Sequence, residues 1–359
     1  MFSRLQVIFV LLLFIGISNH VLILPHLLQA AKRDAWICVL VGYVILLLWA
    51  IVLNIIIKNS KQKKLVVWVK ERSGSGIATG VISIFMVYTI LTAIISFYDL
   101  TQTVDIYFLP ITPKVLIVFP FLLLCVIAGY NNLKTIVYLS TFFLPIVWIL
   151  GHFVAFSTMG EKAYSYMFPV LTYGSEPIIK GTIIVMGGSI DLLFLVLLQH
   201  HINKRFTFVY IVVLISLLAG LILGPTLGSI AAFGPNVAAN MRFPAFEQWR
   251  LVMIGEHISH VDFLAVLQLL CGTTIRVSLC LFFLYDILKS HTNLTKQILF
   301  LIVSTILAVI SIYPVSDIWM QTFLSIYFYP AALTFGLLMS LFLLIISYLP
   351  EKKGMESKL

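Results

Sequence analysis

Two charged residues stand inside long apolar runs of this sequence. Asp191 ends the stretch VMGGSID, and Arg276 lies in CGTTIRVS. A charge within a membrane-spanning helix is costly unless it faces the protein interior and has a partner. We therefore expect Arg276 to face the centre of a helix bundle and to pair with Asp191 or with backbone carbonyl oxygens. Such a pair could serve a binding site or could simply lock the bundle, and the sequence leaves both roles open.

Small residues gather at two places within apolar runs. FIGISNHVLILP, residues 14–25, lies in the first run, and VMGGSID, residues 185–191, lies in the sixth. Helices interrupted at corresponding positions of two halves often form a transporter's binding site, because freed backbone groups can bind a ligand. Close helix packing uses small residues too. The candidate ligand-binding residues in these clusters are Gly16, Ser18, Asn19, Gly187, Gly188 and Ser189.

Further polar residues could line the same site. Tyr88 lies near the middle of the third apolar run, and Thr273 and Thr274 lie in the eighth. The tyrosine could cover a ligand or pack in the core. The threonines could bind a ligand or hydrogen-bond their own helix. His20, beside the first cluster, is expected to hydrogen-bond a neighbouring helix rather than a ligand.

Other polar and small residues favour structural interpretations. Asp99 and Asp105 lie near the outer end of the third run, where we expect them to be hydrated. Gly220 and Gly224 form a small-xxx-small pair that predicts close packing of the seventh run.

The sequence contains no enzyme signature. It has no phosphate-binding glycine loop with its lysine, no HExxH and no Gly-x-Ser-x-Gly motif. The pair His200–His201 is weak evidence for a metal. The four cysteines lie in apolar runs without CxxC spacing, so neither a disulfide framework nor a metal site is favoured. We therefore expect no catalytic residue, no metal and no cofactor.

The composition is that of an integral membrane protein. Of 359 residues, 61% are hydrophobic and 10% are charged, whereas soluble domains carry about 25% charged residues. We expect one transmembrane domain over 1–359, with a first half at 1–157, a second half at 181–349 and a tail at 350–359. The ten predicted spans are residues 5–28, 36–57, 77–100, 115–129, 135–156, 181–200, 206–231, 261–288, 297–312 and 319–349.

The distribution of Lys and Arg predicts the orientation. With the N-terminus inside, fifteen of these residues fall inside and seven outside, so both termini are expected to be cytoplasmic. The net charge of +9 is interpreted as membrane topology rather than nucleic-acid binding. The connection 58–76 is expected along the inner membrane surface or as a solvated linker. The connection 232–260 is expected to form a short amphipathic helix over the outer face.

Three stretches resemble the GerAB-type B-subunit family of spore germinant receptors. They are ISNHVLILPHLLQAAKRDAWI from Ile17, FLPITP from Phe108, and RFPAFEQWRLVMIGEHISHVDFLAVLQ from Arg242. That family is related to the amino acid/polyamine/organocation transporters, which have the LeuT fold. Together with the two clusters, the resemblance predicts an all-α protein of ten transmembrane helices. These would form a LeuT-like five-plus-five inverted repeat with broken helices 1 and 6.

The resemblance also implies a function. Such subunits are expected in the spore inner membrane beside a larger A subunit and a lipoprotein C subunit. They would hold a small-molecule germinant, usually an amino acid, between helices 1, 3, 6 and 8. Family members often carry a basic residue at the position of Arg276, which could replace an ion bound by transporters. Gly188-Ser-Ile-Asp191 departs from the Gly-x-Glu that is common there, so the germinant's identity does not transfer.

Two other functions remain open. The chain could be a working amino acid secondary transporter, coupled to protons through Asp191 or His20. It could also be a membrane scaffold whose pocket is vestigial. Saturable uptake by the purified protein would favour the transporter, and bulky substitutions that change folding alone would favour the scaffold.

Overall fold

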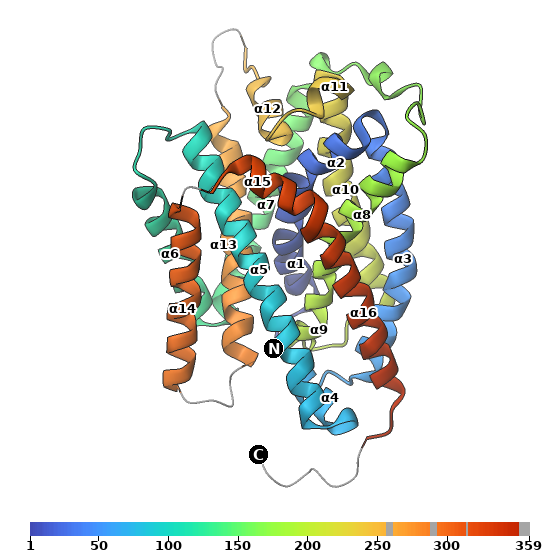
Figure 1. Ribbon diagram of the computed structural model, residues 1–359, viewed down its shortest axis with the longest axis vertical. Helices are drawn as coiled ribbons and strands as arrows, with labels where there is room; N and C mark the ends of the chain where they lie inside the picture. Colours follow the sequence, from blue (N-terminus) through green and yellow to red (C-terminus); the bar gives the residue numbers. More distant parts are fainter. Residues whose placement is uncertain (256–260, 288–292, 314, 352–359) are drawn as a thin grey trace.

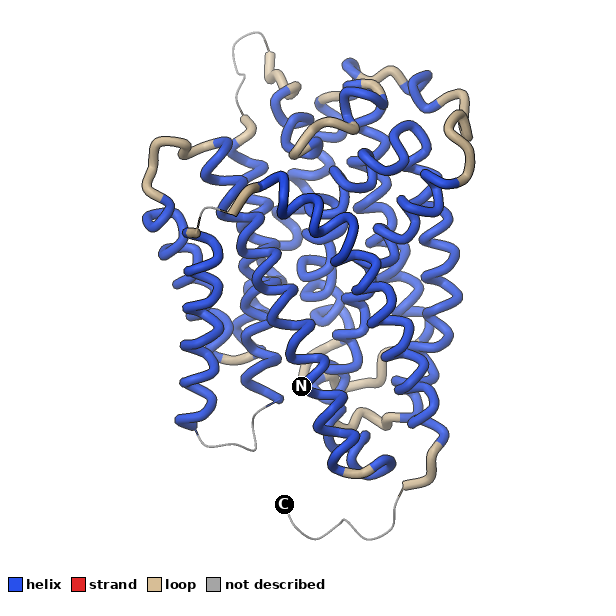
Figure 2. The backbone as a smooth tube through the Cα atoms, viewed as in Figure 1, coloured by secondary structure: helices blue, strands red, loops and turns tan. Residues whose placement is uncertain are grey.

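A computed structural model describes residues 1–255, 261–287, 293–313 and 315–351. These residues form an all-helical bundle without a β-strand (Figure 2). Helices satisfy their own backbone hydrogen bonds, which apolar segments in a bilayer require. Within the described residues, eight helical stretches are long and apolar enough to cross a membrane, so the protein is an integral membrane protein.

The first half of the chain contains seven α-helices and two short irregular segments. They are α1 (Arg4–Ile17), a π-helical turn (Ser18–Leu22), α2 (Ile23–Ala31), a 3-10 turn (Lys32–Asp34), α3 (Ala35–Asn59), α4 (Leu65–Ser73), α5 (Ser75–Tyr107), α6 (Lys114–Asn131) and α7 (Leu133–Ser157).

After two short 3-10 turns, Met159–Glu161 and Tyr164–Met167, the second half follows. Its members are α8 (Glu176–Ser189), a 3-10 turn (Ile190–Leu193), α9 (Phe194–Leu198), a 3-10 turn (Gln199–His201), α10 (Phe208–Phe233), α11 (Pro235–Ala238), α12 (Pro244–Arg250), α13 (Phe263–Ile287), α14 (Asn293–Ile312), α15 (Asp317–Phe323), a π-helical turn (Leu324–Phe328) and α16 (Tyr329–Tyr348).

The eight membrane-length stretches correspond closely to the ten predicted spans. The stretch Arg4–Asn59 holds the first two predicted spans, because the chain turns back at Lys32–Asp34 between α2 and α3 (Figure 1). The ninth predicted span is the shorter apolar helix Gln297–Ile312. Each predicted span thus corresponds to helical structure.

The sixth predicted span lies at the centre of the bundle. In the most apolar 18-residue part of Glu176–His201, 94% of the residues are buried, compared with 72% in the same part of α13 and 17% in that of α7. Around it, α8 packs against α2, α3 and α16, while α13 packs against α1 and α5. The interrupted segments therefore lie in the protein interior, where irregular backbone is tolerated in a membrane.

Short helices close both ends of the bundle (Figure 1). At one end, α4 packs against α5 and buries Leu65, Trp68 and Val69. The connection is therefore packed on the bundle rather than a solvated linker, and its expected position along the inner membrane surface stays a prediction. At the opposite end, α12 buries Phe246 and Trp249, as predicted for an amphipathic helix. The predicted segment also included residues 256–260, which lie outside the described residues.

The prediction for Gly220 and Gly224 was wrong. A Cβ atom added at either glycine of α10 would meet no atom within 4 Å. Neither glycine therefore packs α10 tightly against another helix of the described chain, and both line a cavity.

Candidate ligand-binding site at the interrupted helices

The first interruption is a π-helical turn, Ser18–Leu22, rather than an unwound break. The Ser18 N–H bonds to the Ile15 carbonyl, although in a regular α-helix it would serve Phe14. The Nδ1 atom of His20 lies 2.5 Å from the Gly16 carbonyl oxygen, to which it donates. His20 thus bonds its own helix, not a neighbouring one as expected. Single π-helical turns inside α-helices are frequent at functional sites.

The second interruption follows α8, where the helix tightens into the 3-10 turn Ile190–Leu193. Ser189 Oγ donates to the Val185 carbonyl at 2.8 Å. A Cβ atom at Gly187 would overlap the backbone of Tyr329, and one at Gly188 would overlap the Ile23 side chain. Both glycines therefore have a packing role, which the sequence left as an alternative to ligand binding.

This packing predicts unequal effects of alanine at the two glycines. Gly187→Ala should destabilise the protein by about 1–3 kcal/mol or more, because the obstructing atoms belong to a backbone that cannot rotate away. Gly188→Ala should cost less, since the tip of Ile23 can change rotamer. The melting temperatures of the two purified variants test this order. Equal melting temperatures would contradict it.

A buried polar network joins the two interruptions to α5 and α13. Arg276 Nη2 lies 2.6 Å from Asp191 Oδ2. Its Nε donates to Ser96 Oγ at 2.6 Å, and its Nη1 donates to the Phe14 carbonyl at 2.5 Å. The guanidinium carbon also lies 4.9 Å from the Phe14 ring centroid. The arginine is thus held by α1, α5 and the turn after α8.

Asp191 and Arg276 are almost fully enclosed, with side chains 1% and 4% exposed. Tyr88 donates from its hydroxyl to Asp191 Oδ1 at 2.7 Å, so both oxygens of the carboxylate have partners. The Tyr88 ring stacks on Phe335 at 4.5 Å between centroids. Such burial is tolerable only because each charge is paired and hydrogen-bonded.

The other candidate ligand-binding residues lie near this network and differ in their burial and contacts. Asn19 is fully buried, and its side-chain oxygen and nitrogen have no hydrogen-bond partner among the described residues. Asn19 and Ser189 border a cavity of about 10 Å³, which is space for roughly one water. Ser18 is buried beside Gly188. Thr273 and Thr274 are both buried in α13.

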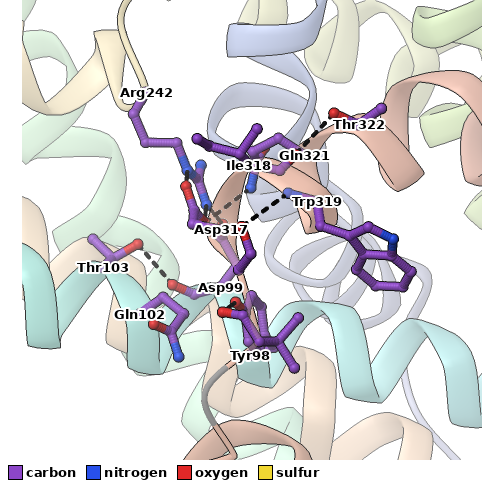
Figure 3. A network of polar contacts seen from close by, with 12 residues as sticks. Tyr98, Asp99, Gln102, Thr103, Arg242, Asp317, Ile318, Trp319, Gln321 and Thr322 are labelled. Carbon is purple, nitrogen blue, oxygen red and sulfur yellow. Dashed lines mark hydrogen bonds and ion pairs between the residues drawn. The ribbon is translucent and has the colours of Figure 1, made fainter.

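A second ion-pair network lies at the α12 end of the bundle (Figure 3). Arg242 Nη2 lies 2.8 Å from Asp99 Oδ1, and its Nε lies 2.8 Å from Asp317 Oδ2. The Asp99 side chain is only 4% exposed, so the expectation that Asp99 is hydrated was wrong. No pattern in the sequence indicates that Arg242 would reach Asp99. This contact ties the connection before α12 to both α5 and α15.

A third charged cluster lies at the α4 end. Asp286 Oδ2 lies 3.2 Å from Lys64 Nζ, 3.4 Å from His200 Nε2 and 3.9 Å from His201 Nε2. The two histidines and the aspartate could hold a metal ion by type and spacing. The lysine already supplies a cation to Asp286, however, so the arrangement fits an ion-pair lock better than a metal site.

The fold and the site define an integral membrane protein with polar groups buried where its central helices are interrupted. Residues 3–317 match the family model described as spore germination protein. The chain is also 35% identical over 356 residues to Spore germination protein XB of Bacillus anthracis, covering 98% of this chain and 99% of that protein. The chain therefore belongs to the spore permease family of spore germination proteins.

Proposed function

We propose that this protein is the nutrient-sensing B subunit of a spore germinant receptor. A small molecule, in the first instance an amino acid, binds between α1–α2, α5, α8–α9 and α13 and triggers germination. The observation that carries the proposal is the Arg276 network, because it links all four of these elements through atoms 2.5–2.7 Å apart. A ligand that enters there necessarily changes how the four elements fit together.

The proposed site is closed around its polar groups, which suits a switch. The cavity beside Asn19 and Ser189, at about 10 Å³, is far smaller than the 300–1,000 Å³ typical of ligand pockets. A germinant must therefore bind a second, more open conformation. A ligand shifts such an equilibrium by its difference in affinity for the two states.

The surroundings of the site are part of the same proposal. We place the protein in the spore inner membrane with both termini cytoplasmic, as ten transmembrane helices in a LeuT-like inverted repeat. It signals to an A subunit and a lipoprotein C subunit. Proton-coupled amino acid transport is the less favoured function, because Asp191 would have to leave Arg276, 2.6 Å away, before it could exchange a proton.

Asn19 offers a direct test of the proposal. Asn19→Leu removes two buried polar atoms that lack partners, so folded stability should stay equal or rise by about 1 kcal/mol. If Asn19 recognises the germinant, spores that carry this variant at normal protein level should lose at least tenfold in nutrient sensitivity. Release of stored small molecules after addition of single amino acids measures this. A stable variant with an unchanged response would argue against a site at Asn19.

A further inference from the structure

A much larger cavity lies outside the proposed germinant site. Its volume is about 510 Å³, and its walls are formed by α7 and α10, with contributions from α12 and α13. His20 borders it at the π-helical turn, and Lys162 borders it beyond the end of α7. This volume falls within the range of specific ligand pockets.

The shape of the cavity follows from small residues on α10. Gly220 and Gly224 leave the helix surface open on this side. The lining of α10 runs from Ser216 to Pro225, which is about 13 Å at 1.5 Å per residue. The indole rings of Trp148 and Trp249 add apolar wall. In the most apolar 18-residue parts of α7 and α10, only 17% and 28% of the residues are buried. These helices therefore face the bilayer, and the cavity between them lies at the bilayer-facing side of the bundle.

The cavity lining carries a positive charge and no negative charge among the described residues. Lys162 is its one residue with a permanent charge, and no carboxylate lines the cavity among the described residues. The Lys162 Nζ donates to the Ala155 carbonyl at 3.1 Å, a helix-capping contact, and no anion acts on its charge within the described chain. The ammonium group of an amino acid would find no carboxylate here, whereas an anion would find Lys162.

Polar groups are few elsewhere in the lining. The Trp148 Nε1 atom is buried away from the open space and offers the cavity no donor. Gln268 Nε2 is already used by the Val147 carbonyl at 2.8 Å, so its oxygen remains available as an acceptor. A largely apolar cavity with a few polar groups and a cation at one end matches an elongated amphiphile.

We propose that this cavity binds the acyl chain of an anionic amphiphile, with the head group at Lys162 and the chain between α7 and α10. The site is separate from the proposed germinant site and does not depend on it. Because His20 borders the cavity and bonds the Gly16 carbonyl, the ligand contacts the same π-helical turn from its other side.

The two cavity tryptophans provide the test. The full chain is purified in detergent and titrated with bromine-labelled fatty acid, phosphatidylglycerol or phosphatidylcholine, because bromine quenches indole fluorescence on contact. Trp148→Phe identifies the share of the signal that arises in the cavity. We expect saturable quenching by an anionic compound, and at least tenfold weaker binding of the zwitterionic lipid. Saturation by the fatty acid or by phosphatidylglycerol identifies the source of the anion, and either result supports the proposal.

Two pairs of variants make the test specific. Gly224→Leu fills the cavity and should abolish saturable quenching. Gly80→Leu, at an equally open glycine of α5, is the control and should leave the quenching unchanged. If Gly224→Leu fails to fold, Gly220→Leu takes its place. Lys162→Gln should weaken anion binding at least fivefold, while Lys180→Gln, at a lysine paired with Glu176, should not. Equal quenching by anionic and zwitterionic lipids, or quenching that survives cavity filling, would overturn the proposal.

Discussion

Replacing Arg276 with methionine is expected to reduce stability by about 3–5 kcal/mol, since it leaves a buried charge without its partner. The Asp191 carboxylate, 1% exposed, would retain only the hydroxyl of Tyr88. The Phe14 carbonyl and Ser96 would lose a partner as well. The yield of monodisperse protein and its melting temperature should both fall, and spores carrying the variant should not respond to nutrient.

A double variant separates the ion pair from simple packing. Arg276→Met combined with Asp191→Asn removes both charges and keeps a hydrogen-bond acceptor for Tyr88. We expect it to recover at least half of the lost stability, because replacing a whole buried pair is often close to neutral. If the pair also belongs to the sensing site, the nutrient response should remain absent in this folded protein. A stability loss that is simply additive would contradict the ion-pair account.

Replacing Arg242 with glutamine should have the second largest effect. The change removes the partner of Asp99, 2.8 Å away and almost fully buried, and should cost about 1–3 kcal/mol. Because Arg242 holds the connection before α12 to α5 and α15, its loss should favour the open conformation. Spores carrying the variant should then respond at lower nutrient concentration or without nutrient.

Lys114 provides the matched control for Arg242. It pairs with Asp105 at 3.3 Å at the same end of α5, where both side chains are more exposed, at 32% and 17%. Lys114→Gln should therefore change neither stability nor nutrient threshold appreciably, since exposed pairs contribute little. A shift in nutrient threshold with Lys114→Gln equal to that with Arg242→Gln would show that general charge, rather than the Arg242 contact, sets the threshold.

The central contact could be predicted because isolated charges in apolar runs need partners. Asp191 and Arg276 stand out in the sequence for that reason alone. Ser96 and the Phe14 carbonyl do not stand out. Serine is common in membrane helices, and the Phe14 carbonyl is available because the Ser18 amide bonds elsewhere. The cluster of small and polar residues predicts an interruption at this place, but not which backbone carbonyl the interruption frees.

Two features were missed for related reasons. The π-helical turn Leu324–Phe328 in the last span lies in ordinary apolar sequence, and Pro330 just after it was the one available signal. Asp99 was expected to be hydrated because it lies near a span end. Its burial depends on Arg242, which is 143 residues away. Contacts between a span and a distant connection are set by tertiary packing, which periodicity and composition do not encode.

The most direct test of the account is ligand binding by the purified protein. Thermal unfolding is measured with a panel of single amino acids and sugars, since a ligand that binds the folded state raises its stability in proportion to the logarithm of its concentration. We predict that one amino acid, or a few related ones, raises the melting temperature of the wild-type protein but not of Asn19→Leu. If none of the panel raises it, or if the wild-type protein and Asn19→Leu respond equally, the proposed germinant site is contradicted.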